Sequence, residues 1–379
     1  MPHETMTPRE RWLAVFTRQK PDRVPMDYWA TPEFSAKLIR HLGLSSKSER
    51  ELAEGLNVPA ADNLLKPTQG YAAWREMLKQ LHIDWVMSVA PRYVGPKLAE
   101  NTDVFGCRYR DADYGTGLYA ECVYHPLAQF SSVEEIERQY IWPDPDWWGY
   151  AEIPQQLVGN EMYPIRGGGS EPFLIYKDLR GQQQAFMDLV EHPDVVHYCL
   201  DKLFGLAYEN TRRIYEQIPG QVMLSYVAED MGGQNNLMFS VKHIHEFLLP
   251  RMKRMIDLAH EAGVYVFHHN DGNCRRILPD MLEAGIDLLN PIQWRCKDME
   301  REGLKRDFGD KLVFHGAVDN QYTLPFGTPA EVRQEVLDNL RILGDGGGYI
   351  LAPCHNIQAV SPPENIVAMY ETCYEHGRI

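Results

Sequence analysis

The stretch VYVFHHNDG, residues 264 to 272, joins a short β-branched and aromatic run to an abrupt polar end. A run of this composition, bounded by glycine, is typical of a buried strand. Similar runs alternate with longer amphipathic patterns over most of the chain, which predicts parallel strands joined by helical crossovers. The expected strands are Arg23 to Asp27, Trp85 to Ala90, Tyr163 to Gly167, Gln221 to Ala228, Val264 to His269, Leu288 to Ile292, Leu312 to Ala317 and Tyr349 to Pro353. Because eight strands close a (β/α)8 TIM barrel, this α/β architecture is the predicted fold class.

The segments between the strands fit the outer helices of a barrel. Ser240 to Glu261 and Pro329 to Leu343 place apolar residues at three- and four-residue spacing, and Ser240 and Thr328 are positioned as N-caps. All 379 residues fit one barrel once insertions are included, so a single domain over residues 1–379 is predicted.

One region, near residues 95–150, interrupts the alternation. The part from Asp103 to Pro126 alternates aromatic and polar residues around Gly115-Thr116-Gly117, which predicts an inserted β-hairpin. The following WPDPDWWGY, residues 142 to 150, is predicted to be a loop rich in Pro and Trp. Such an insertion would either wall the active site or decorate the surface, and the sequence leaves both alternatives open.

Composition restricts the partners of the protein. The formal net charge is −15 and no stretch is rich in Lys or Arg, which argues against binding to nucleic acid or to an anionic membrane. No apolar run approaches the roughly 18 residues that span a bilayer, and residues 1 to 20 lack the apolar core of a secretion signal. Seven scattered cysteines without a CxxC pair argue against a disulfide framework. We therefore expect a cytoplasmic protein that acts on a small molecule or on another protein.

Polar side chains gather where four of the expected strands end. In a barrel these carboxyl ends share one rim, and functional residues come from there. The four ends carry Glu229-Asp230, His268-His269-Asn270-Asp271, His315 to Asp319, and Cys354-His355-Asn356. Acids, imidazoles and a thiol are thus predicted to converge on one site.

His269 and Asp271 are the first candidates for metal ligands. At positions i and i+2 they lie on the same side of an extended chain, and Cys354 or His355 is expected to join them from an adjacent strand of the closing barrel. Imidazole, carboxylate and thiolate together suit a borderline ion such as zinc. The alternative is that these are ordinary strand-end histidines bonded to their neighbours, since His-x-Asp alone is not a metal motif.

Other polar residues allow both a functional and a structural interpretation. Glu229 and Asp230 could act as general acid or orient a substrate, or one of them could cap a helix or pair with an arginine. Asp319, just before Asn320-Gln321, favours capping over chemistry. The run Arg166-Gly-Gly-Gly-Ser170 is similar to an anion-binding loop but lacks the ending of a P-loop, so it predicts close backbone approach to a substrate.

Several long segments, in the same order along the chain, resemble one known family. They include TPRERWLAVFTRQKPDRVPMDYW (7–29), YHPLAQFSSVEEIERQYIWPDPD (124–146), EDMGGQNNLMFS (229–240), FHHNDGNCRRILPDMLEAGIDLLNPIQ (267–293), FHGAVDNQYTLPFGTPAEV (314–332) and GGGYILAPCHNIQAVSPPENIVAMY (346–370). These segments resemble the uroporphyrinogen decarboxylase superfamily, and within it the branch of corrinoid- and thiol-dependent methyltransferases. The resemblance covers nearly the whole chain. It implies a TIM barrel with the active site in its C-terminal mouth.

The resemblance also implies a metal site. The methyltransferase branch holds zinc by a His-x-Cys pair and a distant Cys. His269 matches the His, Asp271 stands in place of the first Cys, and Cys354 lies in the segment that supplies the second. Because a carboxylate replaces a thiolate, the ion would be harder and more Lewis-acidic, which weakens the case for thiol activation.

Similarity to the haem-pathway decarboxylase is weaker at its chemistry. Where that enzyme grips substrate carboxylates with arginines, this chain has PMDYWATPEF (25–34), and where that enzyme has an aspartate this chain runs VMSVAPRY (86–93). His355 matches a late histidine of the decarboxylase, and Tyr226 falls near its polar strand end. We therefore expect no turnover of uroporphyrinogen.

The leading hypothesis is a metal-dependent methyltransferase, one half of a corrinoid-linked demethylation system, with zinc as cofactor and a corrinoid protein as partner. The second is a metal-free decarboxylase or lyase of a small carboxylate, with His355 and Asp230 as proton donors. The third is a barrel without chemistry that binds a corrinoid protein. The predicted residues are His269, Asp271 and Cys354 for metal, Glu229, Asp230 and His355 for catalysis, and Trp29, Arg166, Tyr226, Asn270 and Gln293 for substrate.

Overall fold

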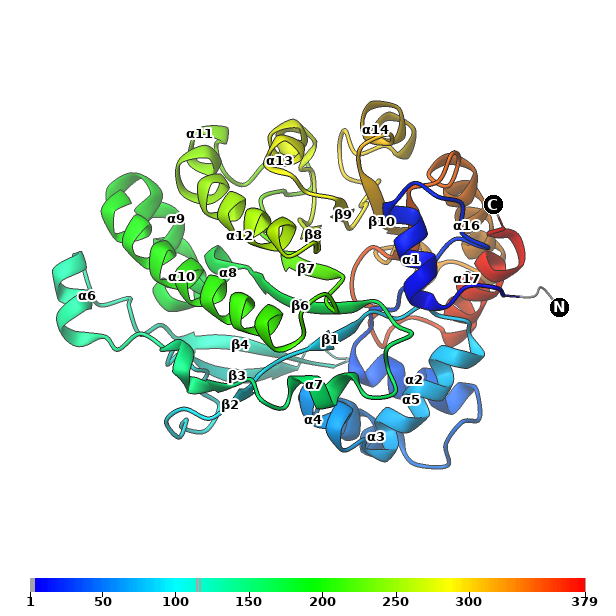
Figure 1. Ribbon diagram of the computed structural model, residues 1–379, viewed down its shortest axis with the longest axis horizontal. Coiled ribbons are helices and arrows are strands. Elements are labelled where there is room, and N and C mark those ends of the chain that lie inside the picture. Colours follow the sequence, from blue (N-terminus) through cyan, green and yellow to red (C-terminus); the bar gives the residue numbers. More distant parts are fainter. Residues whose placement is uncertain (1–3, 114, 116, 379) are drawn as a thin grey trace.

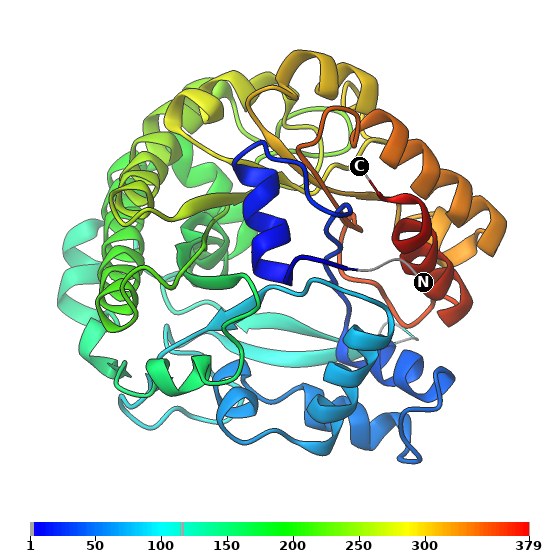
Figure 2. The ribbon, with the colours of Figure 1, turned by 45° about the vertical axis from the view of Figure 1, so that its right-hand side comes forward.

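The computed structural model describes residues 4–113, 115 and 117–378. Its centre is a parallel sheet in the order β1-β6-β7-β8-β9-β10-β11 (Figure 1). The strands are β1 (Met87–Val89), β6 (Ile165–Ser170), β7 (Leu224–Val227), β8 (Tyr265–His269), β9 (Leu288–Asn290), β10 (Val313–Val318) and β11 (Tyr349–Pro353). β9, β10 and β11 are buried along their whole length, as expected for parallel strands covered on both faces. The sheet curls, and helices surround its outer side (Figure 2).

Within the described residues the sheet has seven strands, whereas the sequence predicts eight. The segment predicted as the first strand, Arg23 to Asp27, forms only an isolated parallel bridge between Met26 and Leu351 of β11. Leu351 N donates to Pro25 O over 2.9 Å, and Asp84 N, ahead of β1, donates to Met26 O over 2.7 Å. Pro25 has no N–H with which to continue a ladder. The segment therefore bridges β11 and the approach to β1 without becoming a strand.

Helices follow most strands, as the alternation predicts. The described helices are α1 (Pro8–Phe16), α2 (Pro32–His41), α3 (Glu49–Leu56), α4 (Ala60–Leu65), α5 (Gln69–Gln80), α6 (Val133–Gln139), α7 (Ile153–Leu157), α8 (Pro172–Arg180), α9 (Gln182–Glu191), α10 (Pro193–Gln217), α11 (Val241–His243), α12 (Leu249–Glu261), α13 (Leu278–Ala284), α14 (Arg301–Phe308), α15 (Thr323–Phe326), α16 (Pro329–Ile342) and α17 (Pro363–His376), with short 3-10 turns at Pro145–Trp147 and Arg275–Ile277. None of the described helices is long and apolar enough to cross a membrane.

The helix predicted over Ser240 to Glu261 is divided. Ser240 caps it, accepting from His243 N over 3.1 Å, but a π-helical turn, Ile244–Leu248, separates α11 from α12. Pro250 cannot donate a backbone hydrogen bond to the preceding turn, which accounts for the interruption. The second predicted cap, Thr328, accepts from Glu331 N in a capping box at the start of α16.

Two small antiparallel pairs occupy the region near residues 95–150. β3 (Arg108–Asp113) pairs with β4 (Leu118–Tyr124), and β2 (Arg92–Tyr93) pairs with β5 (Trp148–Gly149). The expected turn at Gly115-Thr116-Gly117 lies partly outside the described residues, because Thr116 is not among them. The β3 and β4 side chains are mostly exposed, so this pair is largely turned to solvent.

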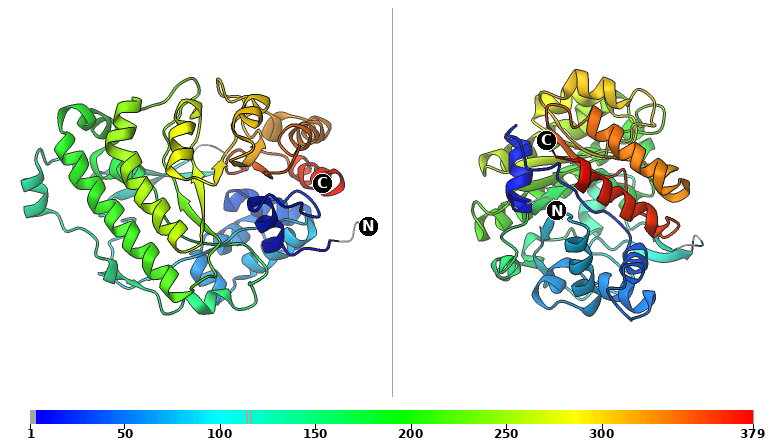
Figure 3. Two further views of the ribbon diagram at one scale, coloured as in Figure 1. Left: turned by 45° about the horizontal axis from the view of Figure 1, so that its top comes forward. Right: turned by 90° about the vertical axis from the view of Figure 1, so that its right-hand side faces the viewer.

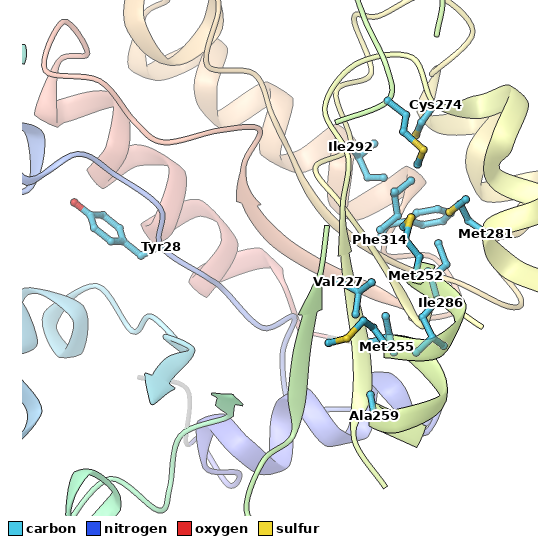
Figure 4. Packing of buried hydrophobic residues seen from close by; sticks show 14 of the residues in the cluster. Tyr28, Val227, Met252, Met255, Ala259, Cys274, Met281, Ile286, Ile292 and Phe314 are labelled. Atoms are coloured by element: carbon cyan, nitrogen blue, oxygen red, sulfur yellow. The ribbon is translucent and has the colours of Figure 1, made fainter. Parts of the chain in front are cut away.

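A methionine-rich core fixes the strands that carry the polar ends. Met252 and Met255 of α12 lie beside Val227 of β7, and Met281 of α13 lies near Phe314 of β10 (Figure 4). All five side chains are buried. The two ends of the fold also meet, since Val24 N donates to Gly377 O over 2.7 Å and α1 and α17 lie on the same side (Figure 3). The strand ends are therefore held by a packed scaffold rather than by loops alone.

Candidate metal centre and adjoining cavity

Three side chains at the ends of β7 and β8 converge. One ligand atom each of Asp230, His269 and Asp271 lies within 4.8 Å of the others, and His269 Nε2 is 3.7 Å from Asp230 Oδ1. His269 is buried and both carboxylates are half-buried. A separation of 3.7 Å is close to that of two atoms bound to one ion at about 2.1 Å each. The set of one nitrogen and two carboxylate groups fits a divalent cation.

Each member of this cluster is held by a hydrogen bond. His269 Nδ1 lies 2.6 Å from Asn290 Oδ1. Asp271 Oδ1 accepts from Gln293 Nε2 over 2.8 Å, and Asp230 Oδ1 accepts from Asp271 N over 3.0 Å. Partners of this kind orient metal ligands and limit their motion. The cluster is therefore preorganised.

Negative charge is concentrated beside the cluster. Burial raises the pKa of Asp271, and the charge of Asp230 raises it further. Glu171, directly after β6, is half-buried. Burial raises its pKa to about 7, with additional contributions from Asp230 and Asp271 that His269 and Lys177 oppose. Carboxylates that crowd one another in this way favour a bound cation.

Sequence reasoning missed Glu171. The predicted strand, Tyr163 to Gly167, ends before β6 does (Ile165–Ser170), because the glycine run that completes β6 is similar to an anion-binding loop. As a carboxylate directly after a strand end, Glu171 has the same signal as Glu229 and Asp230. The glycines of this run do allow close backbone approach, but largely within the fold, because a Cβ on Gly169 would lie 2.1 Å from Tyr226 O. The same run also lines a cavity, so its approach to a substrate stays a prediction.

Cys354, the third predicted ligand, is not part of the cluster of described residues. Its thiol donates to Ile292 O over 3.2 Å, and burial raises its pKa well above the usual range. The expectation that it comes from a strand adjacent to β8 is wrong, because β9 and β10 separate β11 from β8. β7 does pair with β8, so Asp230, which follows β7, takes the third position.

The predicted catalytic residues separate into different places. Asp230 lies in the cluster. His355 is exposed at the rim, with Nε2 3.9 Å from Asp271 Oδ2. Glu229 is buried and accepts from Phe173 N in the first turn of α8 over 2.9 Å, and burial raises its pKa well above the usual range. The arrangement of Glu229 fits the capping alternative.

Two further residues considered in the sequence analysis, Asn270 and Asp319, accept hydrogen bonds from backbone N–H groups. Asn270 is buried, and its Oδ1 accepts from Met231 N and Gly232 N over 2.9 and 3.2 Å. It therefore holds the loop that carries Asp230. Asp319 accepts from Tyr322 N and Thr323 N over 2.9 and 3.0 Å at the start of α15, which is the capping role that the sequence favoured.

A cavity of about 930 Å³ adjoins the cluster. Trp29 and Tyr226 stack on the His269 ring, with centroid separations of 5.8 and 5.7 Å, and both line the cavity together with Glu171. Much of the remaining wall is aromatic: Tyr28, Tyr71, Trp74, Trp85, Phe105, Trp148 and Phe267. Phe105 and Trp148 belong to the region near residues 95–150, so part of that region walls the cavity while β3 and β4 stand apart from it.

Arg166 places a cation in this cavity. Its Nε donates to Ser88 Oγ over 2.9 Å, and its guanidinium carbon lies 5.2 Å from the Tyr226 ring centre. No carboxylate of the described residues lies within ion-pair distance of it, and burial lowers its pKa. A guanidinium with free Nη groups in an apolar wall is suited to a carboxylate or another anion.

The fold and the cluster are typical of α/β enzymes whose active site lies at the carboxyl ends of parallel strands. A family model described as "Uroporphyrinogen decarboxylase (URO-D)" matches residues 155–376, more than half of the chain. The chain belongs to this family, as its sequence resemblance predicted.

Similar proteins agree with this family. The uroporphyrinogen decarboxylase of Neisseria meningitidis (serogroup C, strain FAM18) is 26% identical to this chain over 61% of its residues. The chain spans only 59% of the length of that protein. The Pseudomonas entomophila uroporphyrinogen decarboxylase is 27% identical over 69% of this chain and 74% of its own length. Among solved structures, a methyltransferase from Methanosarcina mazei matches with a TM-score of 0.67 at 18% identity, covering 98% of this chain and 99% of the other. At that identity the match supports the shared fold.

Proposed function

We propose that this protein is a metal-dependent methyltransferase of the URO-D family, acting on a small molecule in a corrinoid-linked system. The observation that carries the proposal is the cluster of Asp230, His269 and Asp271, because it offers an ion three ligands beside a large cavity. Zinc is the first ion to test. When bound, it would act as a Lewis acid on the methyl donor. Two carboxylates make the site hard, which favours an oxygen-containing donor over a thioether.

The cavity supports binding of a small organic anion. Trp29 and Tyr226 would contact its apolar body, and the free Nη groups of Arg166 would bind its anionic group. This arrangement would orient the donor with its methyl group toward the open mouth of the site. The reduced corrinoid of a partner protein is the proposed acceptor.

Methyl transfer must balance charge and protons. The bond from the donor heteroatom to its methyl carbon breaks, the heteroatom keeps the electron pair, and the two electrons of cob(I)alamin form the new carbon–cobalt bond. The leaving heteroatom then takes a proton. Glu171, whose pKa burial raises to about 7, is placed in the cavity wall to supply it.

Two measurements test this proposal. Metal analysis of the purified protein is expected to find about one divalent ion per chain, and His269→Ala is expected to lose it while His376→Ala, an exposed histidine, keeps it. Methyl transfer to cob(I)alamin from a panel of methylated organic acids is expected to follow the metal content. A protein that binds no divalent ion, and that leaves cob(I)alamin unmethylated across the panel, would contradict the proposal.

The second candidate is a metal-free decarboxylase or lyase of a small carboxylate. The free guanidinium of Arg166 in the cavity favours it, since a carboxylate substrate needs such a partner. In that case His355→Ala abolishes CO2 release while Asp271→Ala leaves it intact. Binding of a corrinoid protein without turnover of any substrate would instead favour the third hypothesis, a binding partner.

A further inference from the structure

A buried chain of hydrogen bonds leads from His269 to Asp27, which also lines the cavity. His269 Nδ1 lies 2.6 Å from Asn290 Oδ1, Asn290 Nδ2 lies 2.7 Å from His315 Nδ1, and His315 Nε2 lies 3.1 Å from Asp27 Oδ2. All four side chains are buried. They come from β8, β9, β10 and the segment that bridges to β11, so the chain crosses the inside of the curled sheet.

The far end of this chain is fixed on several sides. Asp27 Oδ2 also accepts from Trp29 Nε1 over 2.8 Å, and Asp27 Oδ1 accepts from Tyr28 N over 2.9 Å. The Asp27 carbonyl oxygen accepts from Tyr370 Oη over 2.8 Å. A carboxylate held in this way has one orientation to offer His315.

The chemistry of each group sets the direction of the chain. A carboxylate only accepts, so His315 Nε2 donates to Asp27. Neutral His315 then has its lone pair on Nδ1, which accepts from the Asn290 amide nitrogen. Asn290 Oδ1 can only accept, and His269 Nδ1 must therefore carry the proton. The lone pair of His269 is left on Nε2, the atom that faces Asp230.

We infer that Asn290 is a positioning residue, supported by His315 and Asp27, that fixes His269 in the tautomer with its lone pair on Nε2. This inference rests on the proposed function, because that tautomer is the one able to bind an ion at the cluster. Without the chain, His269 would distribute between two tautomers, and its ring would lose its only described hydrogen bond on the Nδ1 side. Among the described residues, neither Asn290 nor His315 belongs to the cluster or lines the cavity, so both would act through His269.

The test reads the tautomer directly. Two-bond 1H–15N NMR of histidine-labelled, metal-free protein is expected to show His269 with a protonated Nδ1 and an unprotonated Nε2. The His269 signals are assigned by their absence in His269→Ala. In Asn290→Leu the single tautomer is expected to be lost, and Zn2+ affinity, measured by chelator competition, to fall by about 10- to 100-fold. Asn290→Asp, which keeps the acceptor toward His269, is expected to retain both properties.

Two further variants guard against simple misfolding. Asn339→Leu removes another fully buried asparagine, one that donates to Ala317 O over 2.8 Å, and is expected to leave the tautomer unchanged. His315→Phe acts on His269 only through Asn290 and is expected to mix the tautomers. The inference is overturned if wild-type His269 carries its proton on Nε2, or if Asn290→Leu and His315→Phe both keep the wild-type tautomer.

The two proposals fail separately. If the tautomer behaves as expected but the protein binds no divalent ion and methylates no cobalamin, the positioning chain stands and the proposed function fails. If zinc binds and methyl transfer occurs while the tautomer in Asn290→Leu and His315→Phe is unchanged, the proposed function stands and the positioning chain is overturned.

Discussion

The side-chain amide of Gln293 donates a hydrogen bond to Asp271 Oδ1 over 2.8 Å. The same side chain accepts from Gly272 N through its oxygen over 2.6 Å. Gln293 follows β9, so these bonds tie the loop after one strand to the carboxylate after its neighbour. Gln293 was predicted as a substrate-binding residue, but its contacts indicate that it holds the Asp271 carboxylate in place.

The first prediction concerns this contact. Gln293→Leu keeps a similar side-chain volume but removes both bonds, so Asp271 is expected to lose its orientation and Zn2+ affinity to fall by about 10- to 100-fold. Chelator competition measures the change. Gln183→Leu, at an exposed position of α9, serves as the matched control. Equal zinc affinities for Gln293→Leu and wild type would show that Asp271 needs no support.

The second prediction concerns Arg166. Arg166→Met removes the free guanidinium from the cavity and is expected to raise KM for an anionic substrate by about 10- to 100-fold, since bonds to charged groups are worth about 1.5 to 3 kcal/mol. The neutral amide of the same substrate should be affected much less. Arg254→Met, at an exposed arginine 5.7 Å from the Tyr208 ring centre, is the control. Equal changes for the acid and the amide would exclude a charge-specific role.

Much of the fold was readable from the sequence because it depends on local patterns. The prediction for β11, Tyr349 to Pro353, matches the strand in the structure, and that for β10 is displaced by one residue. Both are largely apolar runs, as is typical of a buried parallel strand. The segment at Arg23 to Asp27 is flanked by two charged residues and contains Pro25, whose missing N–H limits it to a bridge.

The candidate site was less predictable because it depends on which strand ends are neighbours. His269 and Asp271 were identified by their spacing within one strand end. Choosing Cys354 rather than Asp230 required an adjacency that the strand order does not provide. The order of strands along the chain contained the answer, since consecutive barrel strands are neighbours. Glu171 was missed because glycines are unfavourable in strands, so the predicted strand ends at Gly167 rather than at Ser170.

The third prediction is a pH dependence of stability from His268. This side chain is fully buried, with Nδ1 2.8 Å from Val227 O, and burial lowers its pKa from 6.5 to about 4. Between these values the unfolded chain binds a proton that the folded protein does not bind. Stability therefore falls as the pH falls, by about 2 to 3 kcal/mol between pH 7.5 and 4.5 from this group.

Urea unfolding at the two pH values measures this contribution. His268→Gln, which keeps a donor for Val227 O, is expected to show a pH-dependent loss smaller than that of wild type by about 2 to 3 kcal/mol. His376→Gln, at an exposed position, should lose as much as wild type. If His268→Gln and wild type have the same pH dependence, His268 does not stay neutral in the folded protein.

The last prediction concerns Asp84, which binds the segment that bridges β11 and the approach to β1. Its buried carboxylate binds Arg11 Nη1 and accepts from Arg23 Nη1 over 2.6 Å and from Met26 N over 2.9 Å. Asp84→Ala leaves two buried guanidinium groups without this partner. Breaking a buried ion pair from one side costs about 3 to 5 kcal/mol.

We therefore expect Asp84→Ala to lower the free energy of unfolding by about 3 to 5 kcal/mol, measured by urea denaturation. Asp111→Ala, at an exposed position of β3, should change it by less than about 0.5 kcal/mol. Because Met26 N also loses its acceptor, hydrogen exchange at Met26 should rise before that of β8 amides such as Phe267 N. Uniform exchange across both sites, or a loss no larger than that of Asp111→Ala, would mean that Asp84 is not what holds the bridging segment against the sheet.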